Sequence, residues 1–495
     1  MLTKITLAIL LTLGGCATTQ INNNQPTPTT PTHTTTPPPV QIILDGELND
    51  WYGQTGLRAD SDELFICFDS YDESQAIQAA DFTTRIRIDA DANPTTGMRQ
   101  MYSAGVESMM LSQGVDLTID ISPAGKEFDK LRGGSSTRLH TDHATKQVNH
   151  SEVGFYFLPT HNAARYEARL DRSTIPALQH DGPMSVVIEH IAIGGEILKT
   201  QSFTTTLPHY APSKPINDPI APNPTNGVRV MSTNVLFSSP LKNPEPFVRV
   251  TDALDPDVIL YQEWFRTTDT EVQAWFDENL GDDWTQSIIA ADSGIAIASR
   301  LPLIEGGIEI ISEPGARRSR SIAVAVLDAS KNNSTEPLPL IVVSLHLKCC
   351  GGAGSDADIK RIAQARLINK IIGELREKYP NAGVVIGGDF NLVGTRDPLE
   401  IMAAGLGADK QDLVPVPTTV LGTQSMLTWT DADSPYTPGR LDWFLIDDHA
   451  WTPIRSWSLD TARLSDEVLK DSGLKREDSR ATDHLPIVVD LIPAK

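Results

Sequence analysis

The fold class of this chain is decided by the stretch Val384-Val385-Ile386-Gly387-Gly388-Asp389-Phe390-Asn391. Its β-branched residues predict a buried strand, which the two glycines bring to an end. The side chains of Asp389 and Asn391 follow at once. Enzymes with an α/β sheet present their catalytic groups at such strand ends. The stretch therefore predicts an α/β domain that carries polar chemistry at one edge of its sheet.

Apolar runs of the same kind recur from residue 227 to the C-terminus, with helical patterns between them. The clearest helix is expected over Asp356–Lys378, where apolar residues recur every three or four positions; Ser355 can cap its start and Pro380 follows its end. This alternation predicts an α/β fold for residues 227–495. The other expected strands are 228–231, 258–261, 295–298, 322–327, 340–347, 442–446 and 487–491.

The preceding part of the chain has a different pattern, and a length of 495 residues suggests two folded domains. Residues 40–207 contain short apolar runs separated by Gly, Asp, Asn and Pro, which predict an antiparallel β-sandwich. Six prolines between Pro208 and Pro224 predict a linker over residues 208–226. The strands expected in the sandwich are 41–44, 64–68, 84–88, 114–121, 154–157 and 184–190.

The first residues predict export. Lys4 precedes an apolar run over residues 5–13, which is too short to span a bilayer and fits a signal peptide over residues 1–15. Leu13-Gly14-Gly15-Cys16 resembles a bacterial lipobox, which implies acylation of Cys16 and a membrane anchor. Ala17 in the next position favours the outer membrane, with the protein on its periplasmic or surface face. The alternative is a plain secretory signal followed by an unrelated cysteine.

Residues 16–39 are almost wholly Thr, Pro, Asn and Gln, a composition that predicts a disordered tether. The formal net charge of −23 argues against a broad basic face for nucleic acid. A nuclease remains compatible with this charge, because a bound metal ion can supply local positive charge.

Two stretches of the predicted sandwich, which begin at Ile43 and Arg87, resemble motifs of carbohydrate-binding-like modules, and glycan is therefore a candidate partner. The oxygens of Asp89, Asp91 and Asn93 could converge on Ca²⁺, although Asp and Asn before Pro and Gly are also ordinary turn formers. Trp51 is a candidate sugar-stacking platform, and a core position is the alternative.

In the α/β part, polar residues occur at the ends of six expected strands. Each alone is compatible with a cap or a turn. Together they form an ordered set: Asn234, Glu263, His346, Asp389 with Asn391, Asp442, and Asp483 with His484.

This set, with the strings Gly388-Asp389-Phe390-Asn391, Arg440-Leu441-Asp442 and Asp483-His484-Leu485-Pro486, resembles the endonuclease/exonuclease/phosphatase superfamily. The resemblance extends over essentially all of residues 228–493. It implies a four-layer α/β/β/α sandwich and a divalent-metal-dependent phosphoester hydrolase.

Phosphodiester chemistry agrees with the roles that the resemblance implies. The site must neutralise phosphoryl oxygens, position a water and protonate the departing oxygen. Glu263 is expected to bind Mg²⁺ or Mn²⁺, with help from Asn234 and with Asp483 as a candidate second ligand. His484 is expected to act as general base or to hold the attacking water, while Asp442 fixes its tautomer.

The remaining roles concern the transferred group. Asp389 is expected to orient the attacking water or the leaving oxygen, and the Asn391 amide to donate to a phosphoryl oxygen. His346 aligns, in the resemblance, with a histidine that contacts phosphate in deoxyribonucleases and sphingomyelinases; a structural histidine is the alternative.

Three arginines and two cysteines complete the candidates. Arg317, Arg318 and Arg320 could contact phosphate or form a solvated basic loop. Cys349 and Cys350 lack nearby ligands for a zinc site, so a buried or vicinal thiol pair is expected.

The expected substrate is DNA or RNA, hydrolysed by an exported nuclease. A lipid phosphoesterase resembling sphingomyelinases, or a small-molecule phosphoesterase, is a close alternative for a protein held at a membrane. A glycan-binding lipoprotein with an inactive hydrolase domain is a third reading, against which the intact set of polar residues argues.

Overall fold

This computed structural model describes residues 42–47, 49–98, 114–123, 134–141, 144–312, 320–330 and 336–494. The predicted signal peptide, Cys16, the Thr/Pro-rich tether, Arg317 and Arg318 lie outside the described residues. Within these ranges, no helix has the length and apolar character needed to cross a membrane.

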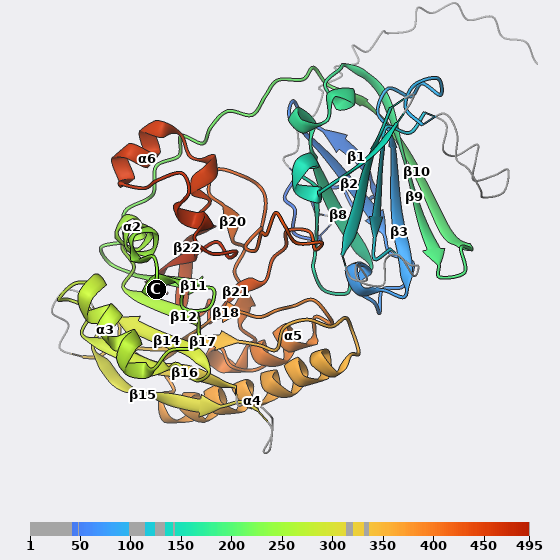
Figure 1. Cartoon of the computed structure of the whole chain (residues 1–495). Coiled ribbons are helices and arrows are strands. Elements are labelled where there is room, and N and C mark those ends of the chain that lie inside the picture. Colours follow the sequence, from blue (N-terminus) through green and yellow to red (C-terminus); the bar gives the residue numbers. More distant parts are fainter. Residues whose placement is uncertain are drawn as a thin grey trace, which may run out of the picture. The chain divides into compact units, whose positions relative to one another are not determined.

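Two antiparallel sheets form the N-terminal half of the described chain (Figure 1). One has the strand order β1 (Gly56–Ala59), β2 (Glu63–Asp69), β8 (Arg165–Asp171) and β7 (Tyr156–Leu158). The other has the order β10 (Ile197–Leu207), β9 (Gly182–Ala192), β3 (Phe82–Asp89), β4 (Leu117–Ile121), β5 (Ser135–His140) and β6 (Thr145–Val148).

Alternate side chains of these strands fill the space between the two sheets. Leu64, Ile66 and Phe68 of β2 belong to the same buried cluster as Ile86 and Ile88 of β3. Every second residue of a strand points to the same face, so strands with this spacing bury one face against a partner sheet. The predicted antiparallel β-sandwich is confirmed.

The strand predictions in this half differ from the structure in two ways. Residues 42–44 lie outside the strands of both sheets, and Leu44 makes one isolated bridge with Ser425. Strands β1, β5, β6, β8 and β10 were not expected. The alternate residues of β10 are exposed and polar, as an edge strand with one solvated face allows. Between β10 and β11 the chain forms no described helix or strand, and the domain boundaries stay a prediction.

Two further sheets form the C-terminal half. The first has the order β13 (Gln286–Ala290), β14 (Gly294–Ser299), β12 (Val258–Trp264), β11 (Val228–Asn234), β23 (Ile487–Pro493), β22 (Trp451–Ser458) and β20 (Thr419–Val420). The second has the order β15 (Leu303–Ile310), β16 (Ser321–Asp328), β17 (Pro339–His346), β18 (Gly383–Asp389), β21 (Asp442–Ile446) and β19 (Val414–Pro415).

Five α-helices of the described chain belong to this half (Figure 1). They are α2 (Pro244–Leu254), α3 (Asp269–Asn279), α4 (Asp356–Lys378), α5 (Asp397–Ala403) and α6 (Asp466–Ser472). The bounds of α4 and its Ser355 cap, which accepts a bond from the Asp358 N–H, agree with those expected from the sequence. Short 3₁₀ helices are η1 (Ile77–Ala79), η2 (His150–Val153), η3 (Arg172–Thr174), η4 (Pro176–Leu178), η5 (Ser239–Leu241), η6 (Ala408–Lys410), η7 (Thr461–Arg463) and η8 (Asp478–Arg480).

Three buried clusters separate the layers of this half. Residues of α2, α3 and α6 pack on the first sheet, and residues of α4 and α5 pack on the second. A third cluster lies between the two sheets. Strand β12 is buried on both faces. Ile259 and Tyr261 pack toward the helices, and Val258 and Leu260 pack toward the other sheet.

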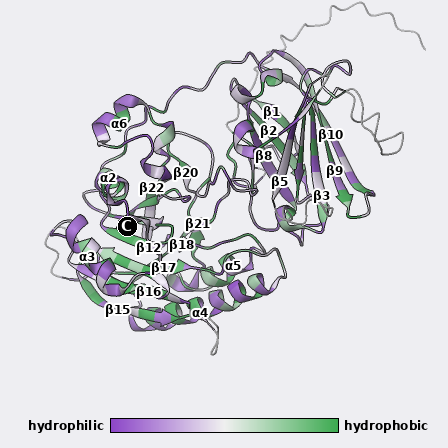
Figure 2. Cartoon of the chain, viewed as in Figure 1, coloured by the Kyte–Doolittle hydropathy of each residue, from purple (hydrophilic) through white to green (hydrophobic). Residues whose placement is uncertain are grey.

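Strands that are buried on both faces need nearly continuous apolar sequence, and each buried Val or Ile contributes about 1.5–3 kcal/mol. Figure 2 shows the mainly hydrophobic strands of this half beside helix α4, which carries both kinds of residue. The predicted four-layer α/β/β/α sandwich is confirmed.

Candidate active site

Strand register brings the predicted polar residues to one edge of the two central sheets. Strands β17 and β18 are parallel, with His346 opposite Asp389, and β21 runs antiparallel to β18, with Asp389 opposite Asp442. In the other sheet β11 and β12 are parallel and end near Asn234 and Glu263. The candidate site is thus assembled from both sheets.

Glu263 lies at an irregularity of its strand. The pairing of β12 with β14 shifts between Gln262 and Trp264, and Glu263 has a φ of 68°. A bulge of this kind redirects a side chain at a sheet edge. The redirected carboxylate accepts hydrogen bonds from the Asn234 amide at 3.2 Å and from the Phe237 backbone N–H at 3.2 Å.

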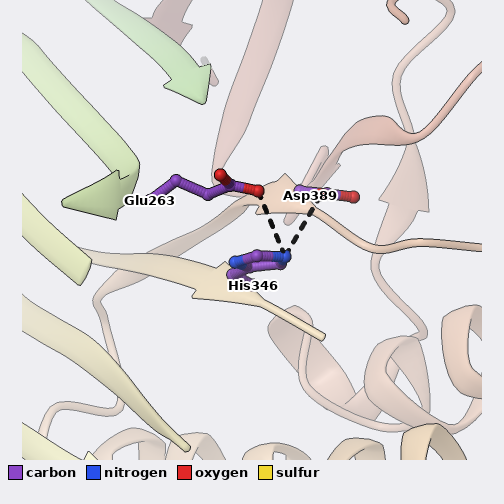
Figure 3. Close-up of side chains that lie close together, drawn as sticks. All are labelled: Glu263, His346 and Asp389. Carbon is purple, nitrogen blue, oxygen red and sulfur yellow. Dashed lines mark ion pairs between the residues drawn. The ribbon is translucent and has the colours of Figure 1, made fainter. Parts of the chain in front are cut away.

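Glu263, His346 and Asp389 form a group that could hold a metal ion, with one ligand atom from each within 4.8 Å of the others. The His346 Nε2 atom is 4.0 Å from Glu263 Oε1 and 3.4 Å from Asp389 Oδ2. Figure 3 shows both dashed contacts meeting at this ring nitrogen.

The donor set fits a hard divalent cation. Burial raises the pKa of Glu263, and burial, with the neighbouring carboxylates of Asp442 and Glu263, raises that of Asp389 to about 8. A cation between them would offset this cost and keep both ionised. Two carboxylates and open positions for water suit Mg²⁺ or Mn²⁺. The sequence predicted only catalytic or phosphate-binding roles for His346 and Asp389, and the geometry makes both candidate metal ligands as well.

His346 is buried, and burial, followed by the nearby Arg320, lowers its pKa well below the usual range. Its ring is therefore neutral at pH 7, which allows it to bind a cation or to hydrogen-bond a phosphoryl oxygen. Arg320 donates to the backbone oxygens of His346 at 2.6 Å and Leu347 at 3.0 Å. The predicted solvated loop is therefore wrong for Arg320, because its side chain is hydrogen-bonded to backbone oxygens beside the site.

His484 and Asp442 form the pair expected from the sequence. The His484 Nδ1 atom lies 2.8 Å from Asp442 Oδ2, and both side chains are buried. Burial alone would lower the pKa of His484, but Asp442, followed by Asp389, raises it to about 10. The other ring nitrogen, Nε2, is 3.9 Å from Asp389 Oδ2, so it faces the group of candidate metal ligands.

Asn391 holds Asp389 in place. Its backbone N–H donates to Asp389 Oδ1 at 2.9 Å, and its side-chain amide donates to Asp389 Oδ2 at 2.9 Å. The residue has a φ of 49°, in the left-handed region that Asn tolerates better than most residues. In the structure Asn391 is therefore a positioning residue for Asp389.

Asp483 is not part of the three-residue ligand group. Its Oδ2 accepts a hydrogen bond from the Trp429 indole at 3.0 Å, and its Oδ1 lies 3.5 Å from the Thr482 hydroxyl. The Asp483 carboxylate is also close enough to His484 and Glu263 to contribute to the raised pKa of each. The sequence gave no signal of the hydrogen bond with Trp429, since this residue is distant along the chain.

The candidate calcium residues are only partly brought together. Asp89 and Asp91 lie in a group with Asp116, whereas the Asn93 side-chain oxygen accepts bonds from Thr95 within its own turn. The Asn93 backbone N–H also donates to Asp89 and Asp91. These are the bonds of a turn, and Asp116, which faces the turn from before β4, was not expected.

Trp51 occupies a core position and is not a sugar platform. Its side chain is buried, and its indole N–H donates to the buried Glu167, which also accepts from the backbone of Asp45 at 3.0 Å. Cys349 and Cys350 are free thiols, and of the two alternatives expected they form a vicinal pair that is not buried, since Cys349 is half-buried and Cys350 is exposed.

The comparisons with known proteins concern the C-terminal half. The profile of the Endonuclease/Exonuclease/phosphatase family matches residues 231–484. The comparison with curated proteins found no match.

Several solved structures share low sequence identity with the chain. An endonuclease/exonuclease/phosphatase family protein from Bacteroides thetaiotaomicron is 16% identical, covering 54% of this chain and 97% of its own, with a TM-score of 0.38. TDP2 of D. rerio, solved with a single-strand DNA product, is 18% identical over 54% and 98%, with a TM-score of 0.37. Sphingomyelinase C from Streptomyces griseocarneus is 17% identical over 53% and 99%, with a TM-score of 0.36.

Proposed function

Because the chain belongs to the endonuclease/exonuclease/phosphatase family of phosphoester hydrolases, we propose that it is a divalent-metal-dependent phosphodiesterase that acts on nucleic acid. The observation that carries the proposal is the convergence of Glu263, His346 and Asp389 beside the bonded pair of His484 and Asp442. These residues could hold a cation, and they would place a neutral imidazole and a potential general base beside it.

The metal, when bound by Glu263 and Asp389, would neutralise phosphoryl charge. His346, neutral in its buried position, would donate a hydrogen bond to a phosphoryl oxygen. Asp389 is one of the carboxylates that raise the pKa of His484 to about 10, and a cation bound by Asp389 would offset that effect. The deprotonated Nε2 of His484 would then take a proton from the attacking water, while Asp442 keeps the opposite nitrogen protonated. Asn391 would hold Asp389 in the orientation that this arrangement requires.

The choice of nucleic acid rests on an aromatic ledge, which consists of Phe265 and Phe237. The ring of Phe265 is 5.8 Å from the His346 ring, and the Phe237 ring is 6.2 Å from that of Phe265. Phe237 is 48% exposed, and the Arg266 guanidinium lies 5.0 Å from its ring centroid. An exposed ring with a cation beside it suits a nucleobase and its adjoining phosphate.

The first experiment compares substrates on the purified full chain. Single-stranded DNA, plasmid DNA, RNA and choline phospholipid vesicles are incubated with Mg²⁺, with Mn²⁺ and with a chelator. We expect metal-dependent cleavage of nucleic acid. Cleavage of phospholipid alone would reject the nuclease hypothesis in favour of a lipid phosphoesterase. If no phosphoester were hydrolysed with any divalent metal, the hypothesis of an inactive, glycan-binding protein would remain.

A second experiment tests the histidine assignment. His484→Ala should abolish most hydrolysis, whereas His449→Ala, at an exposed position that pairs only with its neighbour Asp448, serves as the matched control. Undiminished activity in His484→Ala would refute the role of this residue.

The ledge is tested by Phe237→Ala, with the exposed Leu241→Ala as control. Stacking of one base is worth about 1–3 kcal/mol, so KM for an oligonucleotide should rise roughly 5- to 100-fold. Hydrolysis of bis(p-nitrophenyl) phosphate, which has no nucleobase, should change far less. Equal effects on both substrates would argue against base stacking.

We also propose export and membrane attachment through acylated Cys16. The support is the lipobox-like Leu13-Gly14-Gly15-Cys16 followed by Ala17. Expression with a labelled fatty acid should label the wild type and not Cys16→Ala, and cell fractionation should place the label in the outer membrane. Glycan binding by the sandwich and Ca²⁺ binding near Asp89 stay predictions.

A further inference from the structure

Cys349 and Cys350 are adjacent free thiols in the loop that follows β17, three residues after His346. In an extended chain the side chains of neighbouring residues point to opposite sides. Here Cys350 has a φ of 68° and Gly351 a φ of 72°. These left-handed values curl the loop that carries the two thiols.

The curl is held by a buried arginine of α4. Arg361 donates to the backbone oxygens of Lys348 at 2.8 Å, Cys350 at 2.7 Å and Gly351 at 3.1 Å. Its position is fixed in turn by an ion pair with Asp358 at 3.0 Å. The backbone around both cysteines is therefore held in place by the fold, and the curl of this loop does not depend on the cysteines alone.

Cationic side chains lie beside the first thiol. The Lys348 ammonium is 3.3 Å from Cys349 Sγ, and the Arg320 guanidinium adds a second positive charge. The hydrogen bond from Cys350, followed by these cations, lowers the pKa of Cys349 to about 5, whereas the pKa of Cys350 is raised by the neighbouring Cys349. One sulfur of the pair is thus a thiolate at pH 7, the reactive form.

We propose that Cys349 and Cys350 form a redox-sensitive dithiol, which a low-molecular-weight disulfide or a comparable thiol oxidant converts reversibly into a vicinal disulfide. The half-buried thiolate and the exposed thiol supply a nucleophile and a resolving group in one curled loop. This places a reversible modification site three residues from His346, and it does not depend on the proposed substrate.

The reaction with a disulfide oxidant RSSR balances in two steps. The Cys349 thiolate attacks one sulfur, forms a mixed disulfide and releases RS⁻. With the thiolate charge removed, the Cys350 thiol loses its proton more readily and attacks the Cys349 sulfur, releasing the second RS⁻. The protein loses two hydrogens, and the oxidant is reduced to two thiols.

The product should be easily reduced. The Cα atoms of adjacent residues are about 3.8 Å apart across a trans peptide, below the usual span of a disulfide. Strained and exposed disulfides have high reduction potentials and are the labile, regulatory kind. Reversibility by dithiothreitol is therefore part of the proposal.

The test uses the full chain, reduced, freed of reductant and then exposed to oxidised glutathione. After alkylation under denaturing conditions, trypsin yields residues 349–360 as one peptide that contains both cysteines. We expect this peptide to lose two hydrogens and to escape alkylation, with recovery by dithiothreitol. The buried Cys67 of the sandwich should stay reduced and serves as the internal control.

Two variants separate the steps. Cys350→Ser should stop at a glutathione adduct on Cys349, and Cys349→Ser should react at least about tenfold more slowly at Cys350. The proposal is overturned if both wild-type cysteines are alkylated to the same extent as Cys67 after oxidation. A glutathione adduct that persists on wild-type Cys349 would overturn it equally, because the second thiol would then not resolve the first.

Discussion

Asp442→Asn removes the carboxylate that lies 2.8 Å from His484 Nδ1 and keeps the side-chain shape. In the wild type this carboxylate, with Asp389, raises the pKa of His484 to about 10 despite complete burial. The amide carries no charge and can present its nitrogen to the ring. The substitution therefore changes the charge and the tautomer of His484 while leaving the packing of β21 intact.

The size of the effect follows from this geometry. An opposite charge within hydrogen-bond range shifts a pKa by about 1–3, so the pKa of His484 should fall by that amount, equal to about 1.4–4 kcal/mol. General base catalysis contributes about 10²- to 10⁴-fold, and a misplaced tautomer loses much of it. We expect kcat to fall by about 10²- to 10⁴-fold.

The assay is the pH profile of kcat/KM for bis(p-nitrophenyl) phosphate at saturating Mg²⁺. A base acts when deprotonated, so activity falls as pH falls through its pKa, and a lower pKa moves this acid limb to lower pH. Asp442→Asn should show both the loss and the downward move. The exposed Asp282→Asn is the matched control. A large loss with an unmoved acid limb would refute action through His484.

Further predictions concern the metal, the core and the backbone. Glu263→Gln should raise the Mg²⁺ concentration needed for half-maximal activity by about 10- to 100-fold, as titration calorimetry can check, and an unchanged affinity would remove Glu263 from the ligands. Arg229→Met breaks a fully buried ion pair with Asp490, 2.6 Å long, and should cost about 3–5 kcal/mol in urea unfolding; a cost under about 1 kcal/mol would contradict this. Gly388→Ala, at a φ of 145° and with the Leu345 carbonyl oxygen in the place of the added Cβ, should lower Tm by several degrees, and a Tm equal to that of the wild type would show that the strand can shift.

Much of the fold could be predicted from the sequence, because its determinants are local. Apolar runs such as Val384-Val385-Ile386 indicate strands buried on both faces, and the three- and four-residue spacing over Asp356–Lys378 indicates a helix with one apolar face. Strand β10 was missed for the converse reason, since an edge strand with alternate polar residues lacks a strong apolar signal.

The candidate site could be predicted as a set of strand-end residues but not as a geometry. That Asn234, Glu263, His346, Asp389, Asp442 and His484 belong together followed from their order and the motif strings. Their distances depend on the register of strands from two sheets, which local sequence does not encode. The same holds for Asp483, whose hydrogen bond with Trp429 joins residues that are far apart in the sequence.

The sequence by itself determined the fold class, the family resemblance and the candidate residues, because residue type and spacing carry that information directly. Only the tertiary structure decided how His346 joins Glu263 and Asp389, why Arg320 is bound beside the site, and how Arg361 holds the curled loop of Cys349 and Cys350. Each of these depends on contacts between different elements of the fold, and burial of their charges in a shared low-dielectric environment then sets the protonation states.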